Sequence, residues 1–293
     1  MLIRTLFKET NLDEQTLDWL DERFDDEDLS GVNDWKGVFI KLITTSSLTD
    51  FDIACRIKLF CLPEKLYRFR SIKTCEEFER RLSEIELGKI YCMHPKKLND
   101  PLEMKSILTK EDCDDPSIVK RNELLNGILS ISRIVCFTES WSNLPMWEFY
   151  ANEHKGICLE YDLRSFWGYD NDYHFRNRLH PVIYVDELPN LTEVNLKNVV
   201  RSGFGLDVHA YFYKLRDWGY EKEWRLVFTP DSKTQYAEAF EVEDFIKPSR
   251  VILGTNCLPC HEKKLHNSTK AAGIDIAKVK VMPYGLSVDE LNG

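Results

Sequence analysis

Apolar residues recur with a period of two in several short segments of this chain, which is the pattern of half-buried β-strands. The clearest case lies at residues 222–228, where large apolar residues alternate with Glu223 and Arg225. Because successive side chains of a strand point to opposite faces, the apolar residues form a core face and the two charged residues share the other. A charged face of this kind is commonly solvated, and an exposed pair contributes less than about 1 kcal/mol.

Glu221 extends this polar face, and aromatic residues stand close to it in sequence at Trp218, Tyr220 and Trp224. Aromatic walls provide a stacking surface and lower the polarity around a carboxylate. The segment therefore has two interpretations, a solvated strand or a ligand site containing two carboxylates and Arg225.

Alternating and helical patterns together cover most of the remaining chain. Residues 1–62 have the three-to-four-residue spacing of helices, and Pro63 marks a boundary. Further helices are predicted at residues 75–87, 118–130, 145–155, 191–217 and 258–272, and strands at 66–70, 90–93, 134–140, 156–161, 182–185, 240–242, 251–253 and 279–281. Short strands spread through residues 63–293 predict an α+β domain with a mixed, largely antiparallel sheet and flanking helices.

Composition narrows the classes of function. The 293 residues are 43% hydrophobic and 30% charged with a formal charge of −10, which is typical of a soluble globular protein and disfavours bulk binding to nucleic acid. No apolar run is long enough for a membrane span and no signal peptide is recognisable, so a cytoplasmic protein is expected. The nine cysteines are then interpreted as reduced thiols. The segment Cys257-Leu-Pro-Cys260-His261 is interpreted as a loop whose likeness to half of a zinc site is a coincidence.

Three other groups of polar residues are candidates for binding. Arg68 and Arg70 alternate with Tyr67 on one predicted strand and are either surface charges or an anion site. Thr138 and Ser140 share a face at the end of another strand, where hydroxyls bind a ligand or only satisfy the strand end. The residues around Pro101 form a turn or line a pocket, and their polar members are Asn99, Asp100 and Glu103.

A set of motifs in fixed order resembles the bacterial domain-of-unknown-function family 2971, whose members are related in pattern to abortive-infection phage defence proteins. The resemblance covers roughly residues 63–255. The motifs are Leu66-Tyr-Arg-Phe, Leu98-Asn-Asp-Pro-Leu-Glu103, Cys136-Phe-Thr-Glu-Ser140, Met146-Trp-Glu-Phe-Tyr-Ala151 with His154-Lys-Gly156, and Lys214 through Trp218 to Arg225. The resemblance implies a defence or toxin role.

The order of an arginine strand, a Thr/Ser strand and a Glu-x-Glu strand also resembles ADP-ribosyltransferases. It implies that NAD is a co-substrate, that Glu223 stabilises the transition state and that Glu221 orients or deprotonates the acceptor. Arg68 or Arg70 would hold the pyrophosphate, and Thr138 or Ser140 the ribose or carboxamide. Tyr67, Trp147 or Tyr150 would stack on nicotinamide. The remaining pocket candidates are Asn99, Asp100, Glu103, Lys214, Trp218 and Arg225.

The scheme requires no metal, but two alternatives stay open. One is a metal-dependent, nuclease-like phosphodiesterase with Asp100, Glu103, Glu221 and Glu223 around Mg²⁺. The other is a non-enzymatic defence module that binds a ligand or a partner. The acceptor is an unspecified nucleic acid or protein, and the N-terminal helices are the expected contact for an antitoxin or another partner protein.

Overall fold

Residue contacts divide the chain into two compact units. A computed structural model describes residues 2–8, 10, 12–25, 27–29, 32, 34–43, 45, 47–100, 102, 116, 119–120, 123, 127, 130–162, 178–188, 211–228, 239–242 and 246–291. Unit 1 takes residues 1–62, 98–130 and 175–216, and unit 2 takes 63–97, 131–174 and 217–293. The chain first passes from unit 1 into unit 2 after residue 62, where a boundary was predicted, and two later segments also belong to unit 1.

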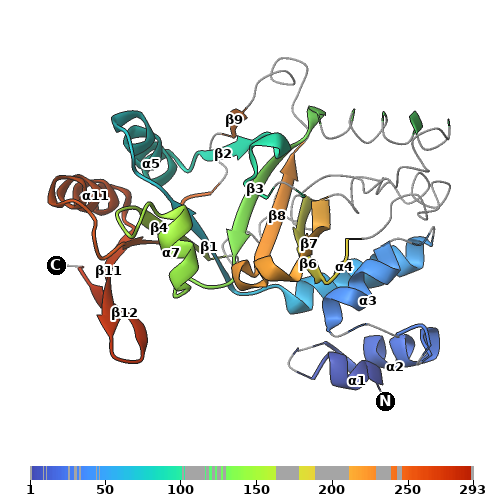
Figure 1. The fold of residues 1–293 in the computed structure, drawn as a ribbon. Helices are drawn as coiled ribbons and strands as arrows, with labels where there is room; N and C mark the ends of the chain where they lie inside the picture. Colours follow the sequence, from blue (N-terminus) through green and yellow to red (C-terminus); the bar gives the residue numbers. More distant parts are fainter. Residues whose placement is uncertain are drawn as a thin grey trace. The chain divides into compact units, whose positions relative to one another are not determined.

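Unit 1 contains the N-terminal helices and short strands (Figure 1). Its elements are α1 (Leu2–Leu6), α2 (Glu14–Arg23), α3 (Trp35–Ile43), α4 (Leu48–Cys61), β5 (Leu179–Pro181), β6 (Ile183–Val185) and β7 (Tyr213–Leu215). Strands β6 and β7 pair in parallel. Of the helix predicted at 191–217, residues 211–212 are helical, whereas 213–215 form β7 and 216–217 begin a 3₁₀ segment. The helix predicted at 118–130 falls largely outside the described residues.

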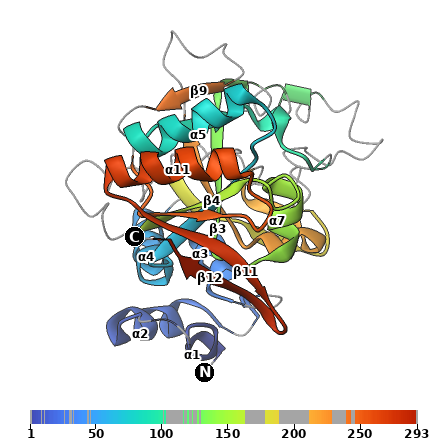
Figure 2. The ribbon, with the colours of Figure 1, turned by 90° about the vertical axis from the view of Figure 1, so that its left-hand side faces the viewer.

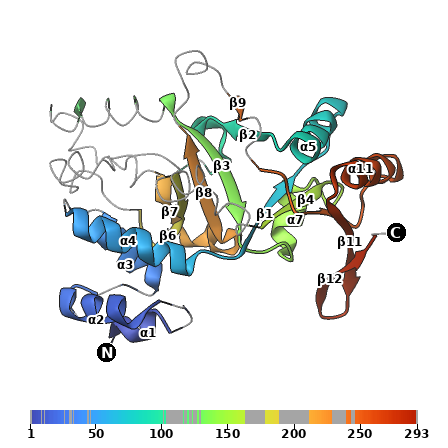
Figure 3. The same ribbon diagram turned by 180° about the vertical axis from the view of Figure 1, so that it is seen from behind.

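Unit 2 is built on a mixed sheet, and its sheet order is β12-β11-β10-β4-β1-β3-β2-β9, with β8 paired to the free side of β3 (Figures 1 and 3). All of these pairs are antiparallel except β10 with β11. The strands are β1 (Lys65–Arg70), β2 (Ile90–Met93), β3 (Arg133–Thr138), β4 (Ile157–Asp162), β8 (Glu223–Phe228), β9 (Ala239–Val242), β10 (Arg250–Leu253), β11 (Asp275–Met282) and β12 (Gly285–Glu290). The predicted α+β class with a largely antiparallel sheet is confirmed.

Two helices lie side by side on unit 2, α5 (Cys75–Leu87) and α11 (Pro259–Ala272) (Figure 2). The N-cap of α5 is Thr74, whose Oγ1 accepts a hydrogen bond from the Glu77 amide at 3.1 Å. Glu77 does not complete a reciprocal capping box: its carboxylate accepts from the Lys73 amide at 2.7 Å instead. The helix ends at Gly88, which has the left-handed conformation of a C-terminal cap.

The opposite face of the sheet packs against α7 (Leu144–Tyr150), whose N-cap is Asn143. Trp147 is fully buried, and its ring meets Phe69 of β1 edge-to-face with the centroids 5.0 Å apart. Cys158 of β4 and Ile252 of β10 belong to the same apolar cluster. Because Tyr67 also packs on this cluster, the odd-numbered residues of β1 point toward α7, and we call this side of the sheet the α7 face.

A short left-handed turn joins α7 to β4. Asn152, Glu153 and His154 all have positive φ, at 51°, 54° and 63°, although this conformation costs roughly 1–2 kcal/mol per residue without glycine. Backbone hydrogen bonds hold it in place, among them His154 N–H to Trp147 O at 3.2 Å and Gly156 N–H to Ala151 O at 2.7 Å. The turn therefore depends on the close approach of neighbouring backbone segments.

None of the helices in the described part of the chain is long and apolar enough to cross a bilayer, in agreement with the sequence. The strand predicted at 279–281 is longer, and it forms with β12 a hairpin that the sequence pattern missed.

Gly156→Ala tests the packing of this turn. An added Cβ would lie 2.2 Å from Arg70 O and 2.9 Å from Ala151 O, both of which are backbone atoms. Because backbone cannot move aside as a side chain can, we expect a loss of at least about 2 kcal/mol in the free energy of unfolding. Chemical denaturation measures it. The control is Gly127→Ala, whose Cβ would meet nothing within 4 Å; an equal effect of the two substitutions would contradict the packing described.

Candidate functional site

Side chains from three neighbouring strands form a row on the α7 face. Tyr67 of β1 lies opposite Thr138 of β3, and Thr138 lies opposite Glu223 of β8. Residues directly opposite one another in antiparallel strands point to the same face. The row continues through Glu160 of β4, which is the register partner of Tyr67. A phenol, a hydroxyl and a carboxylate are thus placed side by side by backbone pairing alone.

Glu223 is fixed by Arg225. The Arg225 guanidinium donates two hydrogen bonds, from Nε to Glu223 Oε1 at 2.9 Å and from Nη2 to Oε2 at 2.7 Å. Glu223 is 4% exposed and Arg225 is 0% exposed. The interpretation of this strand face as solvated is therefore wrong, because the pair is buried and bidentate. Such a pair is retained for geometry more than for stability, since desolvation of the two charges offsets most of their attraction.

Glu221 lies at the end of the 3₁₀ segment η4 (Arg216–Glu221) and is held by Tyr150 of α7. The Tyr150 hydroxyl donates a short hydrogen bond to Glu221 Oε1. The carboxylate is buried, at 3% exposed. The next residue, Lys222, has a φ of 44° and its carbonyl accepts from the Glu139 amide at 3.2 Å. This bend separates Glu221 from the strand pairing that positions Glu223.

Partly buried aromatic side chains surround these carboxylates. Tyr67, Tyr150 and Tyr220 all pack on the Trp147 cluster while keeping part of their surface exposed. The rings of Trp218 and Tyr220 lie 6.1 Å apart and are tilted by 38°. Burial raises the pKa of Tyr67, with the nearby Glu160 charge adding to the effect, so its hydroxyl stays protonated. These rings are available for stacking in a way that a fully buried ring is not.

Thr138 and Ser140 have different surroundings. Thr138 is 1% exposed and lies in the row. Ser140 lies past the end of β3, where its amide donates to Thr138 Oγ1 at 3.4 Å and its hydroxyl pairs with Ser142 Oγ at 3.0 Å. Both hydroxyls satisfy backbone amides at the strand end, since Ser140 Oγ also accepts from the Ser142 amide at 3.2 Å. Thr138 differs in that it also stands between Tyr67 and Glu223 in the row.

Arg68 and Arg70 point away from this row. They alternate with Tyr67 along β1, so they project to the side of the sheet opposite the α7 face. There they bind Glu84 of α5: Arg70 Nη2 lies 2.8 Å from Glu84 Oε1, and Arg68 Nη1 lies 3.5 Å from the same atom. The structure therefore does not bring the two arginines together with Glu223.

The remaining candidates do not belong to the row. Trp147 is a core residue, with its ring against Phe69 and His154 rather than at a surface. Lys214 is buried on β7 of unit 1. Asp100, also of unit 1, accepts a hydrogen bond from the Leu102 amide at 2.9 Å, which confirms the predicted turn, and Asn99 beside it is exposed. Glu103 lies outside the described residues.

Sequence reasoning missed the polar residues that support the row. Asn143 donates from Nδ2 to the Tyr220 carbonyl, and Glu139 accepts from Trp224 Nε1 at 2.8 Å. Glu160 accepts from Lys65 Nζ at 2.5 Å. The N-cap position of Asn143 was the one signal available, because a capping asparagine sits where the chain turns.

In the described part of the chain, no group of three or more His, Cys, Asp or Glu side chains is arranged to hold a metal ion. In the Cys257–His261 segment, Cys257 is buried and His261 stacks on Phe78 with the ring centroids 4.4 Å apart. Burial, with Lys264 close by, lowers the pKa of His261.

Arg225→Met tests the buried ion pair. It leaves the Glu223 carboxylate buried without its guanidinium, and breaking such a pair from one side costs about 3–5 kcal/mol. Urea denaturation measures the change in the free energy of unfolding. Arg80→Met is the control, because Arg80 pairs with Glu76 on the surface of α5 and should cost less than about 1 kcal/mol. Similar losses for both variants would mean that the Glu223–Arg225 pair is not buried as described.

Alkylation by iodoacetamide tests the cysteine environments. Cys75 and Cys260 are exposed, whereas burial raises the pKa of Cys92 to about 12 and that of Cys257 to about 11. Because the thiolate is the nucleophile, Cys75 and Cys260 should be labelled before Cys92 and Cys257 in the folded protein. Peptide mass spectrometry over time gives the order. Labelling of Cys257 before Cys260 would contradict these environments.

Comparison with known proteins gives a match to a family model over residues 146–226. No match was found among curated proteins or among solved structures. The matched segment begins in α7 and ends in β8, so it contains Tyr150, Glu221, Glu223 and Arg225. Residues 146–226 match the family model described as protein of unknown function (DUF2971), the family that the sequence motifs resemble.

Proposed function

We propose that the α7 face of unit 2 binds NAD and transfers its ADP-ribose to a nucleophile on a macromolecule. The observation that supports this most is the row of Tyr67, Thr138 and Glu223, which three adjacent strands hold on one face. A protein core has no need of a carboxylate beside a hydroxyl and a phenol, because each polar group must be desolvated and then satisfied. A ligand with a sugar and an aromatic ring uses all three.

Glu223 is the residue that stabilises the transition state. Cleavage of the bond between nicotinamide and ribose develops positive charge on the ribose, as in glycoside hydrolysis. A carboxylate fixed in advance stabilises that charge without reorganising. The two hydrogen bonds from Arg225 hold both oxygens of Glu223 in one orientation, so the Arg225 guanidinium acts as a positioning group.

Thr138 and the exposed aromatic rings bind the substrate. The Thr138 hydroxyl lies between Tyr67 and Glu223 in the row and is placed to bond a ribose hydroxyl or the carboxamide. Tyr67, Tyr150 and Tyr220 keep part of their rings accessible, and these rings supply the stacking surface for nicotinamide. Trp147, which the sequence also suggested for stacking on nicotinamide, is left out of this role because its ring lies in the core.

Glu221 is the base for the acceptor. In the transfer the ribose–nicotinamide bond breaks, neutral nicotinamide leaves with the bonding electrons, and the acceptor nucleophile forms a bond to the same carbon. Its proton passes to Glu221. The Tyr150 hydroxyl donates to Glu221 Oε1, which holds the carboxylate in place for this proton transfer.

The residue proposed to hold the pyrophosphate differs from the arginines that the sequence suggested. Arg68 and Arg70 lie on the other side of the sheet, but Lys65 alternates with them and shares the α7 face with Tyr67. Its ammonium group is 2.5 Å from Glu160 Oε1 and its side chain is 38% exposed. Lys65 is a partly exposed cation on this face and takes the pyrophosphate in this proposal. The acceptor remains a nucleic acid or protein, in keeping with a defence or toxin role.

Incubation with NAD labelled on its adenylate group, with and without cell lysate, tests the proposal. We expect label transfer or nicotinamide release that a metal chelator does not affect. Glu223→Gln should lower the rate by roughly 100-fold or more, because it removes the charge opposite the ribose. Circular dichroism checks that the variant is folded.

Glu148→Gln is the matched control, since Glu148 lies on α7 with its side chain 53% exposed and should leave the rate unchanged. Folded wild-type protein that neither binds nor consumes NAD would overturn the proposal. Activity that needs a divalent metal and survives Glu223→Gln would point instead to phosphodiester cleavage.

A further inference from the structure

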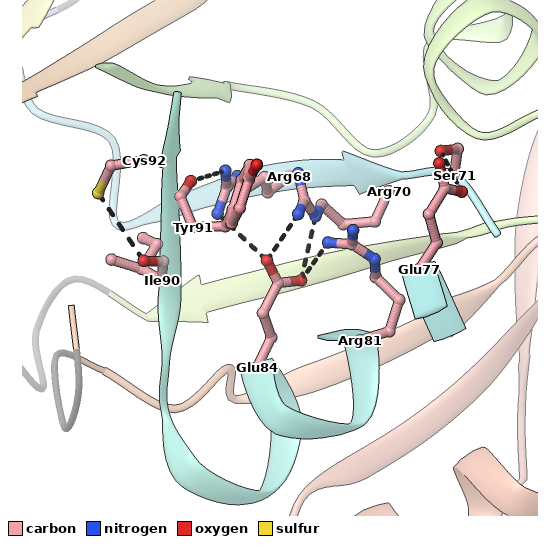
Figure 4. Close-up of polar contacts among 9 residues, drawn as sticks. All are labelled: Arg68, Arg70, Ser71, Glu77, Arg81, Glu84, Ile90, Tyr91 and Cys92. Carbon is pink, nitrogen blue, oxygen red and sulfur yellow. Dashed lines mark hydrogen bonds and ion pairs between the residues drawn. The ribbon is translucent and has the colours of Figure 1, made fainter. Parts of the chain in front are cut away.

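Three arginines surround one buried carboxylate on the face of the sheet opposite the α7 face (Figure 4). Arg68 and Arg70 project there from β1, and Arg81 and Glu84 project from α5. Arg81 Nη1 donates to Glu84 Oε2 at 2.8 Å, and Arg70 Nε donates to the same oxygen at 3.0 Å. We call these four residues the arginine cluster.

The arginine cluster carries more positive than negative charge. Three guanidinium groups share one carboxylate, and the ion pairs that these arginines form with described residues all go to Glu84. The side chains of Arg68, Arg81 and Glu84 are 5%, 6% and 2% exposed. Within the described residues, Glu84 offsets one of these three positive charges at a place where solvent screens them poorly, an arrangement that proteins normally avoid.

Hydrogen-bond donors in the arginine cluster are also left over. Arg68 Nη1 and Arg81 Nε are buried and have no hydrogen-bond partner. Arg68 Nη2 is already used by the Tyr91 carbonyl at 2.7 Å, which fixes the orientation of that guanidinium. Glu84 Oε1 also has no hydrogen-bond partner and lies 3.5 Å from Arg68 Nη1. Since buried guanidinium N–H groups are almost always paired and one leftover oxygen faces two leftover donors, the arginine cluster lacks at least one acceptor.

We propose that the arginine cluster binds a phosphate group, either as free phosphate or as a phosphate ester, between Arg68 and Arg81. The ligand supplies both the missing negative charge and the missing acceptors. Planar guanidinium forks match pairs of phosphate oxygens, which makes arginine the preferred residue for such ligands. This site lies on the side of the sheet opposite Glu223, so it does not depend on the proposed NAD chemistry.

Glu84 has a defined part in this site. It neutralises one of the three charges and holds Arg70 and Arg81 together, which places their forks before the ligand arrives. The neighbouring Tyr161 is fully buried, and burial raises the pKa of its hydroxyl, so the group stays a neutral donor beside the arginine cluster. The same carboxylate also repels an incoming phosphate, so it weakens binding while ordering the site.

Calorimetric titration of the full chain with inorganic phosphate, at constant ionic strength against chloride, measures binding. A second titration with AMP distinguishes a free anion from a phosphate ester by which of the two binds more tightly. We expect saturable binding of at least one probe, together with a phosphate-dependent rise in melting temperature. Absence of binding by both probes to folded protein would overturn the proposal.

Two variants separate a binding role from a structural one. Arg81→Gln removes a ligand contact and should weaken binding by about tenfold or more, because hydrogen bonds to charged groups contribute at least that factor. Glu84→Gln removes the repelling carboxylate and should strengthen binding, although both variants lose an ion pair and melt at lower temperature without phosphate. Arg80→Gln, on the exposed side of α5, should bind as the wild type does.

The opposite signs for Arg81→Gln and Glu84→Gln are the deciding result. If both variants bind the probe with the wild-type affinity, the ligand lies elsewhere on the protein and the proposal fails. If both lose binding together in proportion to their loss of stability, the arginine cluster is a structural clamp between α5 and β1, and the proposal fails as well.

Discussion

The antiparallel pairing of β3 with β1 on one side and β8 on the other decides where the chemically interesting side chains of unit 2 point. Each strand is short, and the register is fixed by backbone hydrogen bonds rather than by side-chain contacts. A slip of one residue in β8 would exchange Glu223 for Trp224 on the α7 face and expose an apolar surface. The positions of Tyr67, Thr138 and Glu223 relative to one another therefore follow from the same pairing that buries the core.

Both faces of this sheet contain buried charges, and they are balanced differently. On the α7 face, Glu223 and Arg225 form a neutral pair with two hydrogen bonds. On the other face, three arginines share Glu84. Burying unbalanced charge is far less favourable than burying a matched pair. The charges described on the α7 face therefore balance, whereas those on the other face leave room for a negatively charged ligand.

The sequence showed which residues of one strand share a side. It did not show which sides of different strands lie on the same face of the sheet. The pattern of β8 predicted that Glu223 and Arg225 share a side, and the pattern of β1 predicted that Tyr67 and Arg68 do not. Which side of β1 joins which side of β8 depends on the register through β3, and that is a tertiary property. The burial of Arg225 was missed for the same reason.

Local signals predicted local structure well and long-range contacts poorly. Thr74 and Gly88 marked the ends of α5 because caps depend on residues next to one another in the chain. Glu84 gave no signal as the partner of Arg70, since only the fold brings α5 back over β1. The hairpin of β11 and β12 was partly missed because its tip exposes apolar residues, with Val281 67% exposed, and so departs from the pattern of a buried strand.

The proposed function places NAD on the α7 face, without a contribution from Arg68 or Arg81. Isothermal titration calorimetry of Glu223→Gln protein with NAD tests it directly, because the slower turnover expected of this variant lets binding be measured. Adding Tyr67→Leu, which keeps the packing but removes the aromatic ring, should abolish measurable binding, whereas adding Arg81→Gln should leave the affinity unchanged. Loss of NAD binding with Arg81→Gln but not with Tyr67→Leu would contradict the account and move the nucleotide to the opposite side of the sheet.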